Sequence, residues 1–494
     1  MQHILAAIDL GSNSFHMIVG KNESGQIIVL DRIREMIRLA SGLDEKNNIS
    51  PEFMNKAFDC LARFGERIRH LDADVVRIVG TNTLRKAHNS NRFMSRGEKI
   101  LGHPIEIISG IEEARLIYSG VAHNVASDNG QRLVVDIGGG STEIIIGERY
   151  KPIRMESLYM GCVSMTKYFF SSGEITRKKI LKAHMHAMRE LEPSIYTYKN
   201  LGWQDAIGSS GTVRAIEKIA IEQGWSSHGI TRDALDKILD HLLDAGHIDK
   251  VSLKGIKAER LPVITGGTIV LNAIFDAFDI ENMVVSNGAL REGILYDLIG
   301  RDKKKNTRSE TVEKFAKRFV IDRAHANRVE KTAQHLFGQV KKSWFKNRGD
   351  AKKTLQWAAI LHEAGLSIAH NHFHKHGAYL TGHADLLGFS RQGQQLLSLI
   401  IQQQRRSLNM ELFNEFESDN NQVGERLTIL LRLAILLNRS RIEEESNIPA
   451  ITVNNKQINL SFDQDWLSAH PLTKSDLEAE VGYLDKAGYR FLFT

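Results

Sequence analysis

Two short segments of this 494-residue chain follow nearly the same pattern, IDLGSNSF at residues 8–15 and VDIGGGST at residues 135–142. Each contains an aspartate, an aliphatic residue, a glycine, two small residues and a serine. Glycines can adopt positive φ angles and let a ligand approach the main chain, and successive N–H groups in such a turn bind anions. Glycine and serine are also common in plain turns. Because the pattern occurs twice, we expect it to bind a phosphate chain.

The two segments provide most of the candidate ligand-binding residues. An aspartate at the end of a strand can hold a divalent cation, usually through water, against phosphate oxygens. Asp9 and Asp136 are therefore candidate metal ligands. The candidate phosphate-binding residues are Gly11, Ser12, Asn13, Ser14, Gly138, Gly139, Gly140, Ser141 and Thr142.

A candidate general base lies between the two segments, in IEIISGIEEARLIYSGV at residues 105–121. Ser109 followed by Glu112 is the pattern of a capping box, which predicts a helix start with Glu112 reaching back to the cap. Glu113 would then be available to orient a water near a cation-bound phosphate, as hydrolysis of a phosphoanhydride requires. Acidic residues in a first helical turn also complement the helix dipole, and this second interpretation stays open.

Further polar residues follow other strands. In VVRIVGTNTLRKAHN, residues 75–89, Arg85 comes just after a strand and is a candidate phosphate clamp, with a surface salt bridge as the alternative. The glycine-containing segments GSSGTVRA, residues 208–215, and VITGGTIVL, residues 263–271, either complete the ligand wall or only turn the chain.

The elements around the repeated segments are strands on both sides. HILAAIDL and FHMIVG flank the first, and RLVVDIG and TEIIIG flank the second, so each is expected to be the turn of a hairpin. A dinucleotide fingerprint or a P-loop is excluded because a helix must follow the glycines there. The repetition predicts two α/β halves that face each other across a phosphate-binding cleft, an arrangement that resembles the actin, hexokinase and acetate kinase superfamily.

The distribution of strand and helix patterns predicts four regions. Strands and helices alternate up to about residue 300, which is typical of an α/β fold. The following stretch is rich in helix formers and all seven prolines lie outside residues 263–448. Strand patterns return in the last fifty residues. We expect lobe I at 1–124, lobe II at 125–304, a helical domain at 305–445 and a small α+β region at 446–494.

Charge and composition narrow the possible partners. The net charge is +6, and residues 301–353 contain 17 Lys and Arg against 6 Asp and Glu, which indicates attraction to a polyanion. No zinc-finger, ribonucleoprotein or basic-zipper motif is present, so nucleic acid is not expected. Two cysteines and no signal-peptide pattern predict a reduced, cytoplasmic protein, with peripheral attachment to the inner face of the membrane left open.

The motifs together resemble one family, that of exopolyphosphatases and guanosine pentaphosphate phosphohydrolases. The matching segments are AAIDLGSNSFHMIV, VGTNTLRKA, IISGIEEARLIYSGV, LVVDIGGGSTEIIIGE, MGCVSMTKYF, GSSGT, GALREGILY and WAAILHEAGLSI. The resemblance implies two actin-like, ribonuclease H-like lobes with a helical C-terminal module, a requirement for Mg²⁺, and removal of terminal orthophosphate from inorganic polyphosphate. It assigns the catalytic glutamate to Glu113, a basic clamp to Arg85, and metal or phosphate roles to Asp136, Gly138, Ser141 and Glu143.

Three segments resemble the exopolyphosphatase branch more closely: VDIGGGSTE, VGTNTLR and LHEAGLSIAHNHFHKHGAYL. The pentaphosphate branch tends to have alanine in place of Gly140. We therefore expect an exopolyphosphatase, with hydrolysis of guanosine-5′-triphosphate,3′-diphosphate (pppGpp), or both activities, as the alternative. A kinase of the same superfamily and a non-catalytic regulator that binds alarmone or polyphosphate are less favoured, and a homodimer is expected from the resemblance.

The helical module resembles the HD phosphohydrolase fold, but LHEAG has glutamate where metal-binding versions have aspartate. Four histidines follow at spacings that do not suit a zinc site, so we expect solvated or anion-facing imidazoles rather than a metal. These are His370, His372, His374 and His376. With Lys341 and Lys342, the module is expected to line a channel for a polyphosphate tail.

Overall fold

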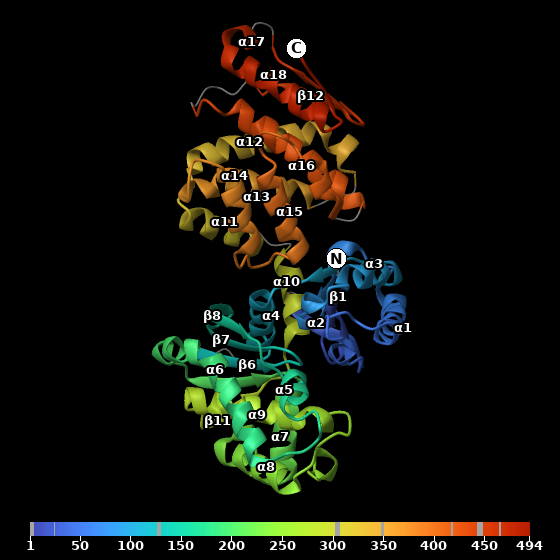
Figure 1. The fold of residues 1–494 in the computed structure, drawn as a ribbon, viewed down its shortest axis with the longest axis vertical. Helices are drawn as coiled ribbons and strands as arrows, with labels where there is room; N and C mark the ends of the chain where they lie inside the picture. Colours follow the sequence, from blue (N-terminus) through green and yellow to red (C-terminus); the bar gives the residue numbers. More distant parts are fainter. Residues whose placement is uncertain are drawn as a thin grey trace. The chain divides into compact units, whose positions relative to one another are not determined.

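The computed structural model describes residues 4–23, 25–125, 130–301, 307–346, 350–415, 418–441, 448–463 and 466–494. The chain forms two compact units, residues 1–306 and residues 307–494. In Figure 1 the first unit runs from blue to yellow and the second from gold to red. The division into four regions made from the sequence stays a prediction.

The first sheet of unit 1 is built around a hairpin. Strands β1 (Ile4–Leu10) and β2 (Phe15–Glu23) are antiparallel, and β4 (Val76–Gly80) lies parallel to β1 on its other side. The strand order is β3-β2-β1-β4-β5, with β3 at Gln26–Glu35 and β5 at Ile105–Ile107. Apolar side chains of this sheet form a core with three helices, which are α1 (Pro51–Ile68), α2 (Asn82–Lys86) and α3 (Ser90–Leu101).

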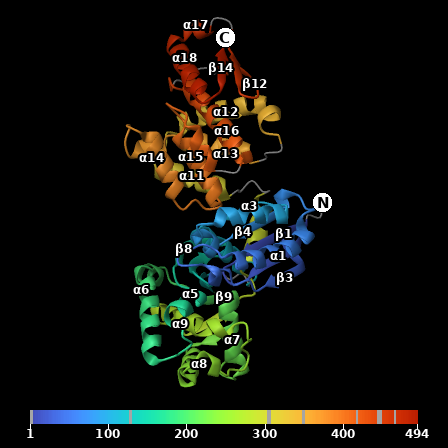
Figure 2. The ribbon, with the colours of Figure 1, turned by 45° about the vertical axis from the view of Figure 1, so that its right-hand side comes forward.

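The second sheet repeats the same arrangement. Strand β6 (Gln131–Ile137) pairs with β7 (Thr142–Glu148) in a hairpin and with the parallel strand β9 (Asp205–Ser209) on its other side. The order is β10-β11-β9-β6-β7-β8, with β8 at Lys151–Leu158, β10 at Ile230–Thr231 and β11 at Asn282–Val285. Its helices are α5 (Cys162–Phe169), α6 (Arg177–Leu201), α7 (Ser210–Glu222), α8 (Arg232–Ala245) and α9 (Leu261–Phe278). Figure 2 shows the long helix α6 and helices α7 to α9 around the lower end of this unit.

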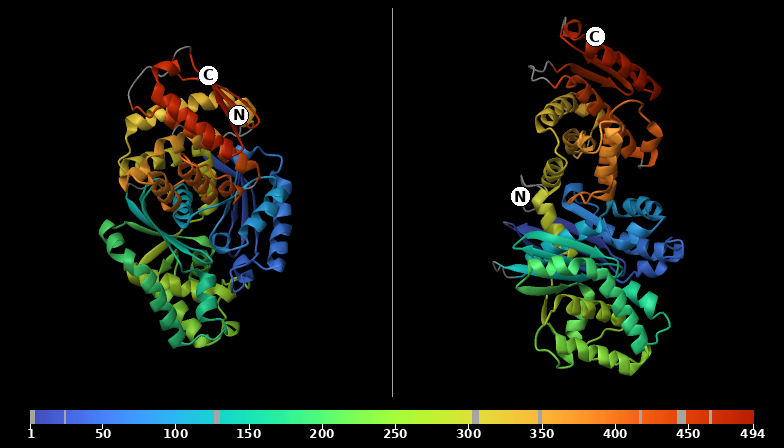
Figure 3. Two further views of the ribbon diagram at one scale, coloured as in Figure 1. Left: turned by 45° about the horizontal axis from the view of Figure 1, so that its top comes forward. Right: turned by 60° about the vertical axis from the view of Figure 1, so that its left-hand side comes forward.

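Two helices join the sheets. One hydrophobic core contains side chains from both sheets together with α4 (Gly110–Ala122) and α10 (Leu290–Arg301). In the left view of Figure 3, the blue strands and the teal strands lie on either side of these helices. The helices touch through their main chains: a Cβ on Gly293 would lie 1.8 Å from the Leu116 carbonyl oxygen. Helix α10 therefore packs on α4 and β1, although its sequence follows lobe II.

Helix α9 is apolar on nearly all sides. By length and composition it could cross a membrane, a candidate that the sequence interpretation did not recognise, but 78% of its 18-residue window is buried inside the protein. It packs against α5, α6, α7 and α8. A helix that is apolar all round and buried in this way is the core helix of the second lobe.

Unit 2 is mostly helical and ends in a three-stranded sheet. Its helices are α11 (Thr307–Arg318), α12 (Arg323–Trp344), α13 (Ala351–Leu361), α14 (Phe373–His383), α15 (Arg391–Gln402) and α16 (Ser418–Leu437). The sheet has the order β12-β13-β14, with strands at Ala450–Asn454, Gln457–Ser461 and Arg490–Phe493, and helices α17 (Trp466–Ala469) and α18 (Pro471–Lys486) between the last two strands. One hydrophobic core spans the helices and the sheet.

Candidate active site

Both repeated segments are hairpin turns, as the sequence predicts. The β1–β2 pairing ends at Leu10 and Phe15, and the β6–β7 pairing ends at Ile137 and Thr142. Each hairpin therefore has a four-residue loop, Gly11–Ser14 in the first (loop 1) and Gly138–Ser141 in the second (loop 2). The loops come from different sheets but nearly touch, since a Cβ on Gly139 would lie 3.0 Å from the Ser12 Cβ.

Neighbouring segments hold the carbonyl groups of loop 1. The Arg38 N–H donates to the Asn13 carbonyl at 2.8 Å, and the Ala40 N–H donates to the Ser12 carbonyl at 2.9 Å. Among the described residues no acceptor is found for the N–H groups of Ser12 and Asn13 or for the buried Nδ2 of Asn13. Donors that have no partner inside the protein suit an anionic ligand.

Helix α5 holds loop 2 in the same way. Its first N–H groups, from Cys162 and Val163, each donate at 2.9 Å to the carbonyls of Gly138 and Gly139. The motif MGCVSMTKYF is therefore the segment that fixes this loop. The side chain of Thr142 does not reach the cavity, because its hydroxyl donates to the Met160 carbonyl at 2.7 Å.

The loop glycines are needed because nearby atoms leave no room for a Cβ, and not because their φ angles are positive. Gly11, Gly138, Gly139 and Gly140 all have φ outside the positive region, so the loops do not use the freedom of glycine to adopt positive φ. Instead, a Cβ on Gly11 would lie 2.9 Å from the Ser14 carbonyl oxygen, and one on Gly138 would lie 3.0 Å from the Ser141 carbonyl oxygen. Any side chain at these positions would disturb the turn.

The candidate base stands at the start of α4. Ser109 caps this helix by accepting a hydrogen bond from the Glu112 N–H at 3.1 Å. Glu113, the next residue, lines the cavity and accepts a hydrogen bond at 2.8 Å from Arg85, which also donates to the Ile108 carbonyl. In this structure Arg85 therefore orients the carboxylate of Glu113, and its side chain is not among those that line the cavity.

Glu112 does not reach back to the cap, and this part of the sequence interpretation is wrong. Its carboxylate is buried and accepts two hydrogen bonds from Arg115, at 2.7 and 2.8 Å. Arg115 also contacts Asp297 of α10 at 2.6 Å, and Arg77 of β4 contacts both Asp297 and Glu106. A two-pronged bond to arginine is stronger than a bond to a cap N–H. The result is a buried network that fixes α4 against α10.

Three more carboxylates surround the loops. Asp9 and Asp136 are the next-to-last residues of β1 and β6, and Glu143 stands opposite Asp136 in the β6–β7 ladder. Burial and the negative charge of Glu113 raise the pKa of Asp9 to about 8, and burial raises the pKa of Asp136 to about 6. Burial and the same charge also raise the pKa of Glu143, which accepts a hydrogen bond from Ser157 at 2.8 Å. Burial is the largest of these effects for all three carboxyl groups.

This donor set fits a divalent cation. The Asp9 Oδ1 atom is buried and has no hydrogen-bond partner among the described residues, and hard oxygen ligands are what Mg²⁺ prefers. Among the described residues, the group of possible metal ligands whose ligand atoms lie close together is not in this cleft. The carboxylates of the cleft are therefore more widely spaced. Wide spacing is compatible with Mg²⁺, which keeps several of its waters and uses one or two carboxylates.

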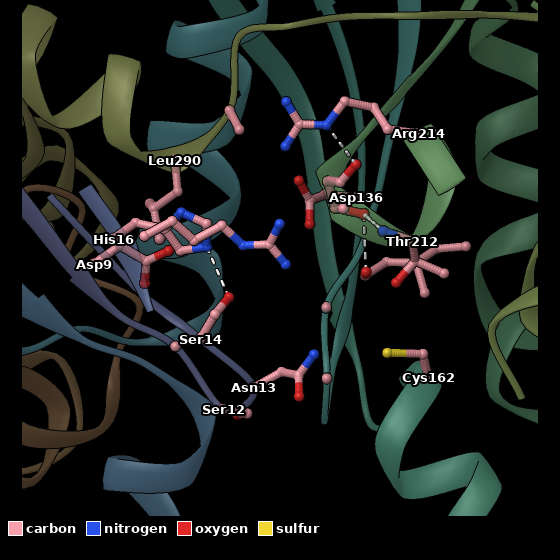
Figure 4. Close-up of a pocket in the computed structure, with 18 of the residues that line it drawn as sticks. Asp9, Ser12, Asn13, Ser14, His16, Asp136, Cys162, Thr212, Arg214 and Leu290 are labelled. Atoms are coloured by element: carbon pink, nitrogen blue, oxygen red, sulfur yellow. Dashed lines mark hydrogen bonds between the residues drawn. The ribbon is translucent and has the colours of Figure 1, made fainter. Parts of the chain in front are cut away.

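The loops open into a cavity of about 500 Å³. Figure 4 shows Asp9, Ser14 and His16 on one wall and Asp136, Thr212 and Arg214 on the opposite wall. The segment GSSGTVRA contributes Ser210, Gly211, Thr212 and Arg214, so it completes the ligand wall. The other glycine segment, VITGGTIVL, lies within the buried helix α9.

The sequence interpretation missed the cationic part of this cavity. Its basic lining residues are Arg32, Arg34, Arg214, Lys218, Lys257, Arg260 and Arg291. Burial and the charge of Arg291 lower the pKa of Arg214, and burial lowers the pKa of Arg260. Arg214 and Arg291 lie inside recognised motifs, which was a usable signal. Arg32 and Arg34 are on the edge strand β3, and nothing local in the sequence indicates that they face the site.

Unit 2 contains the remaining predicted residues. Lys341 and Lys342 are exposed on α12 and do not line the cavity. Of the four histidines, His374 is buried and its Nδ1 has no partner among the described residues, so it is not solvated as expected. The other three side chains are exposed or half-buried.

A different group in unit 2 has the spacing of a metal site. His325, His362 and Glu363 place possible ligand atoms within 4.8 Å of one another. The guanidinium of Arg441 contacts the Glu363 carboxylate, so a cation of the protein already compensates this charge. The sequence interpretation missed His325, which lies 36 residues before the start of the LHEAG motif.

Comparison with known proteins agrees with this architecture. Residues 18–302 match the Ppx/GppA phosphatase family, and residues 307–481 match domain III of the same family. The chain belongs to the Ppx/GppA phosphatase family. It is a phosphoanhydride hydrolase with an actin-like fold and a helical C-terminal domain.

Relatives within the Ppx/GppA family cover almost the whole chain. A guanosine-5′-triphosphate,3′-diphosphate pyrophosphatase of Aeromonas hydrophila is 37% identical over 488 residues, which is 98% of each chain. The protein of the same name from Vibrio cholerae is 37% identical over 486 residues, covering 98% of this chain and 97% of the relative.

Solved structures of the Ppx/GppA type share the fold. An exopolyphosphatase from Cytophaga hutchinsonii has a TM-score of 0.55 and 22% identity, covering 60% of this chain and 98% of its own. A PPX-GPPA enzyme from Aquifex aeolicus has a TM-score of 0.52 and 24% identity, covering 60% and 99%.

Proposed function

We propose that this Ppx/GppA protein removes the terminal 5′-phosphate of pppGpp. The observation that carries the proposal is the cationic part of the cavity, where seven arginines and lysines line the space beyond the two loops. A single phosphate chain between the loops does not need this many cations, whereas pppGpp has a second phosphate group on its 3′ oxygen. The full-length relatives at 37% identity bear the name of this activity.

The reaction is attack of water on the terminal phosphorus. Glu113 accepts the proton of this water, and Arg85 holds the Glu113 carboxylate in place. The N–H groups of the two loops neutralise charge on the transferring phosphoryl group, because they are fixed before substrate binds. The group leaves as orthophosphate, and the product keeps the oxygen that bridged the two phosphates.

Asp9, Asp136 and Glu143 would hold Mg²⁺, since their carboxylate oxygens lie beside the loops and the Asp9 Oδ1 atom has no hydrogen-bond partner among the described residues. Bound Mg²⁺ supplies a positive charge against the phosphate oxygens. In the absence of a bound cation, any ionised carboxylate of this group repels a polyanion, and the arginines that line the same cavity attract it.

Exopolyphosphatase activity is the second candidate. Similar solved structures bear that name, and Lys341 and Lys342 are exposed at the end of a basic helix in unit 2. These lysines would hold a long chain beyond the site of cleavage. This candidate requires that the affinity for polyphosphate depends on chain length.

The two candidates are separated by measuring phosphate release from pppGpp, long-chain polyphosphate and ATP, with and without Mg²⁺. We expect the highest kcat/KM for pppGpp. Lys218→Gln together with Lys257→Gln should raise the KM for pppGpp about tenfold, as loss of charged hydrogen bonds does, and should change the KM for polyphosphate little. Lys182→Gln, an exposed lysine of α6, is the matched control. A kcat/KM at least ten times higher for polyphosphate would favour the second candidate.

The role of Glu113 is tested by Glu113→Gln. We expect kcat to fall about a thousandfold, within the range for loss of a general base, while pppGpp still binds. Glu259→Gln, which changes another carboxylate of the cavity, is the control and should keep most of its activity. Turnover by Glu113→Gln at more than a tenth of the normal rate would exclude this residue as the base.

A further inference from the structure

A histidine and an arginine form a chain of hydrogen bonds behind loop 1. His16 lies on β2, opposite Asp9 in the β1–β2 ladder, and Arg291 lies in the first turn of α10. The Arg291 Nη1 atom is 2.6 Å from the Nδ1 atom of His16. The His16 Nε2 atom is 2.7 Å from the Ser14 hydroxyl oxygen, a contact drawn as a dashed line in Figure 4.

The directions of these bonds follow from the chemistry of the groups. A guanidinium can only donate hydrogen bonds. The Nδ1 atom of His16 must therefore accept from Arg291, so the imidazole is neutral and carries its proton on Nε2. That proton is donated to the Ser14 oxygen.

We propose that Arg291 and His16 act as positioning residues that aim the hydroxyl proton of Ser14 at a phosphate oxygen of the substrate. Because the Ser14 oxygen already accepts from His16, its own proton must point elsewhere. Ser14 lines the cavity in the same loop as the N–H donors of Ser12 and Asn13. The Ser14 hydroxyl could otherwise rotate and accept a hydrogen bond from another group, but here it can only donate. The positive charge of Arg291 at the other end of the hydrogen-bonded chain makes Ser14 a stronger donor.

The surroundings keep His16 neutral. Burial and the charge of Arg291 lower its pKa to about 2, with smaller effects of the same sign from Arg34, Arg214 and Arg260. The direction of the chain is therefore constant over the pH range in which enzymes work. The proposal rests on the proposed binding of a phosphate chain in this cleft, but not on which substrate is hydrolysed.

The test is a double-mutant cycle on the full-length protein, with affinity for inorganic triphosphate measured by calorimetry. Ser14→Ala and His16→Leu should each weaken binding about tenfold, the effect expected for one hydrogen bond to an anion. The double variant should also be about tenfold weaker, because His16 acts only through Ser14. His16→Gln, whose amide can accept from Arg291 and donate to Ser14, should restore affinity to within about threefold of the unchanged protein.

Three outcomes would overturn the proposal: no binding of triphosphate to the unchanged protein, unaltered affinity in His16→Leu, or multiplicative effects in the double variant. A nitrogen NMR spectrum of the unchanged protein, assigned with His16→Gln, tests the proton position without any effect on folding. We expect the proton on Nε2, and a proton on Nδ1 or on both nitrogens contradicts the chain. Phosphate release from pppGpp and polyphosphate is measured separately, so failure of the proposed function is seen independently.

Discussion

The two hairpins of the cleft have loops of the same length but different chemistry. In each, an aspartate precedes a four-residue loop, and the residue opposite that aspartate is His16 in the first hairpin and Glu143 in the second. His16 is bonded to a cation, Arg291, and donates toward its loop. Glu143 is a carboxylate that accepts from Ser157.

The difference shows how a duplicated turn can take two roles. A phosphate chain with a bound cation presents negative oxygens and a positive metal at the same time. The first hairpin is suited to the oxygens, because its second strand contributes a donor. The second hairpin is suited to the cation, because its second strand contributes another carboxylate. Placing a glutamate at His16 in the first hairpin, or a histidine at Glu143 in the second, should therefore impair phosphate binding and cation binding in different ways.

The largest effect is expected for Glu143→His, which makes the second hairpin resemble the first. Removing this carboxylate should lower kcat about 100- to 1000-fold, the range for loss of one electrostatic contact to the transition state. Phosphate release at several Mg²⁺ concentrations measures it. Glu148→His, at the exposed end of the same strand, is the control. A rate for Glu143→His within threefold of normal would show that the hairpins are not specialised.

The reverse exchange, His16→Glu, should have a smaller effect. It places a second carboxylate opposite Asp9, but Arg291 can still pair with it. We expect the KM for the substrate to rise about 10- to 30-fold, since Ser14 would donate to the new carboxylate instead of to the anion and a like charge is added. Steady-state kinetics with a thermal unfolding control measures this change. The comparison between the hairpins fails if KM is unaltered in a folded variant.

The two loop aspartates predict a pH dependence of stability in the metal-free protein. A carboxyl group whose pKa is higher in the folded state stabilises the fold below its unfolded pKa, and this contribution is lost as the pH rises through the folded pKa. For Asp9 the loss runs from about pH 4 to about 8, and for Asp136 it is complete near 6. Stability should therefore fall across this range.

Substitution tests this dependence at each hairpin. At pH 8, Asp9→Asn should raise the free energy of unfolding by about 1–3 kcal/mol and Asp136→Asn by less, because the shift of its pKa is smaller. Neither variant should differ from the unchanged protein near pH 4. Urea unfolding in chelator measures the effect, and equal gains at both pH values would contradict the assigned cause.

The smallest effect is expected for substitution of the first glycine of each loop, a feature that the two hairpins share. Gly11→Ala and Gly138→Ala should each destabilise the metal-free protein by about 1–2 kcal/mol, since each methyl group meets a main-chain oxygen of its own loop. Gly300→Ala, where a Cβ meets nothing within 4 Å, is the control and should be neutral or slightly stabilising. A loss at only one of the two loops would show that they differ in backbone as well as in side chains.

Local patterns predicted the parts of the site that depend on neighbouring residues. The hairpins, the Ser109 cap and the position of Glu113 at the start of α4 all follow from a few adjacent residues. The partners of Glu112 could not be found in this way, because Asp297 lies 182 positions from Arg115 in the sequence. The close approach of Gly11 to the Ser14 carbonyl and of Gly138 to the Ser141 carbonyl was not predicted, because it depends on the detailed backbone geometry of each turn.

The cationic part of the cavity was only partly predictable, for the same reason. Its residues come from the edge strand β3, from α7 and α10, and from the segment before α9. Arg214 and Arg291 lie in recognised motifs, but no local pattern in β3 or in the segment before α9 distinguishes a buried arginine from a solvated one. The sequence interpretation favoured polyphosphate because three segments resemble the exopolyphosphatase branch, and the basic segment with Lys341 and Lys342 agreed with a polyanionic substrate.

The glycine contacts between α4 and α10 set a limit on how the cleft can vary. A single methyl group at Gly120 or Gly293 would collide with the main chain of the facing segment. The two helices, and the lobes that they join, would be pushed apart. Glu113 stands on one of these helices and Arg291 on the other. Pushing the helices apart would move the water-activating Glu113 away from the bound polyanion, although neither Glu113 nor Arg291 had changed. A substitution at Gly120 or Gly293 would therefore inactivate the enzyme without altering a residue of the site.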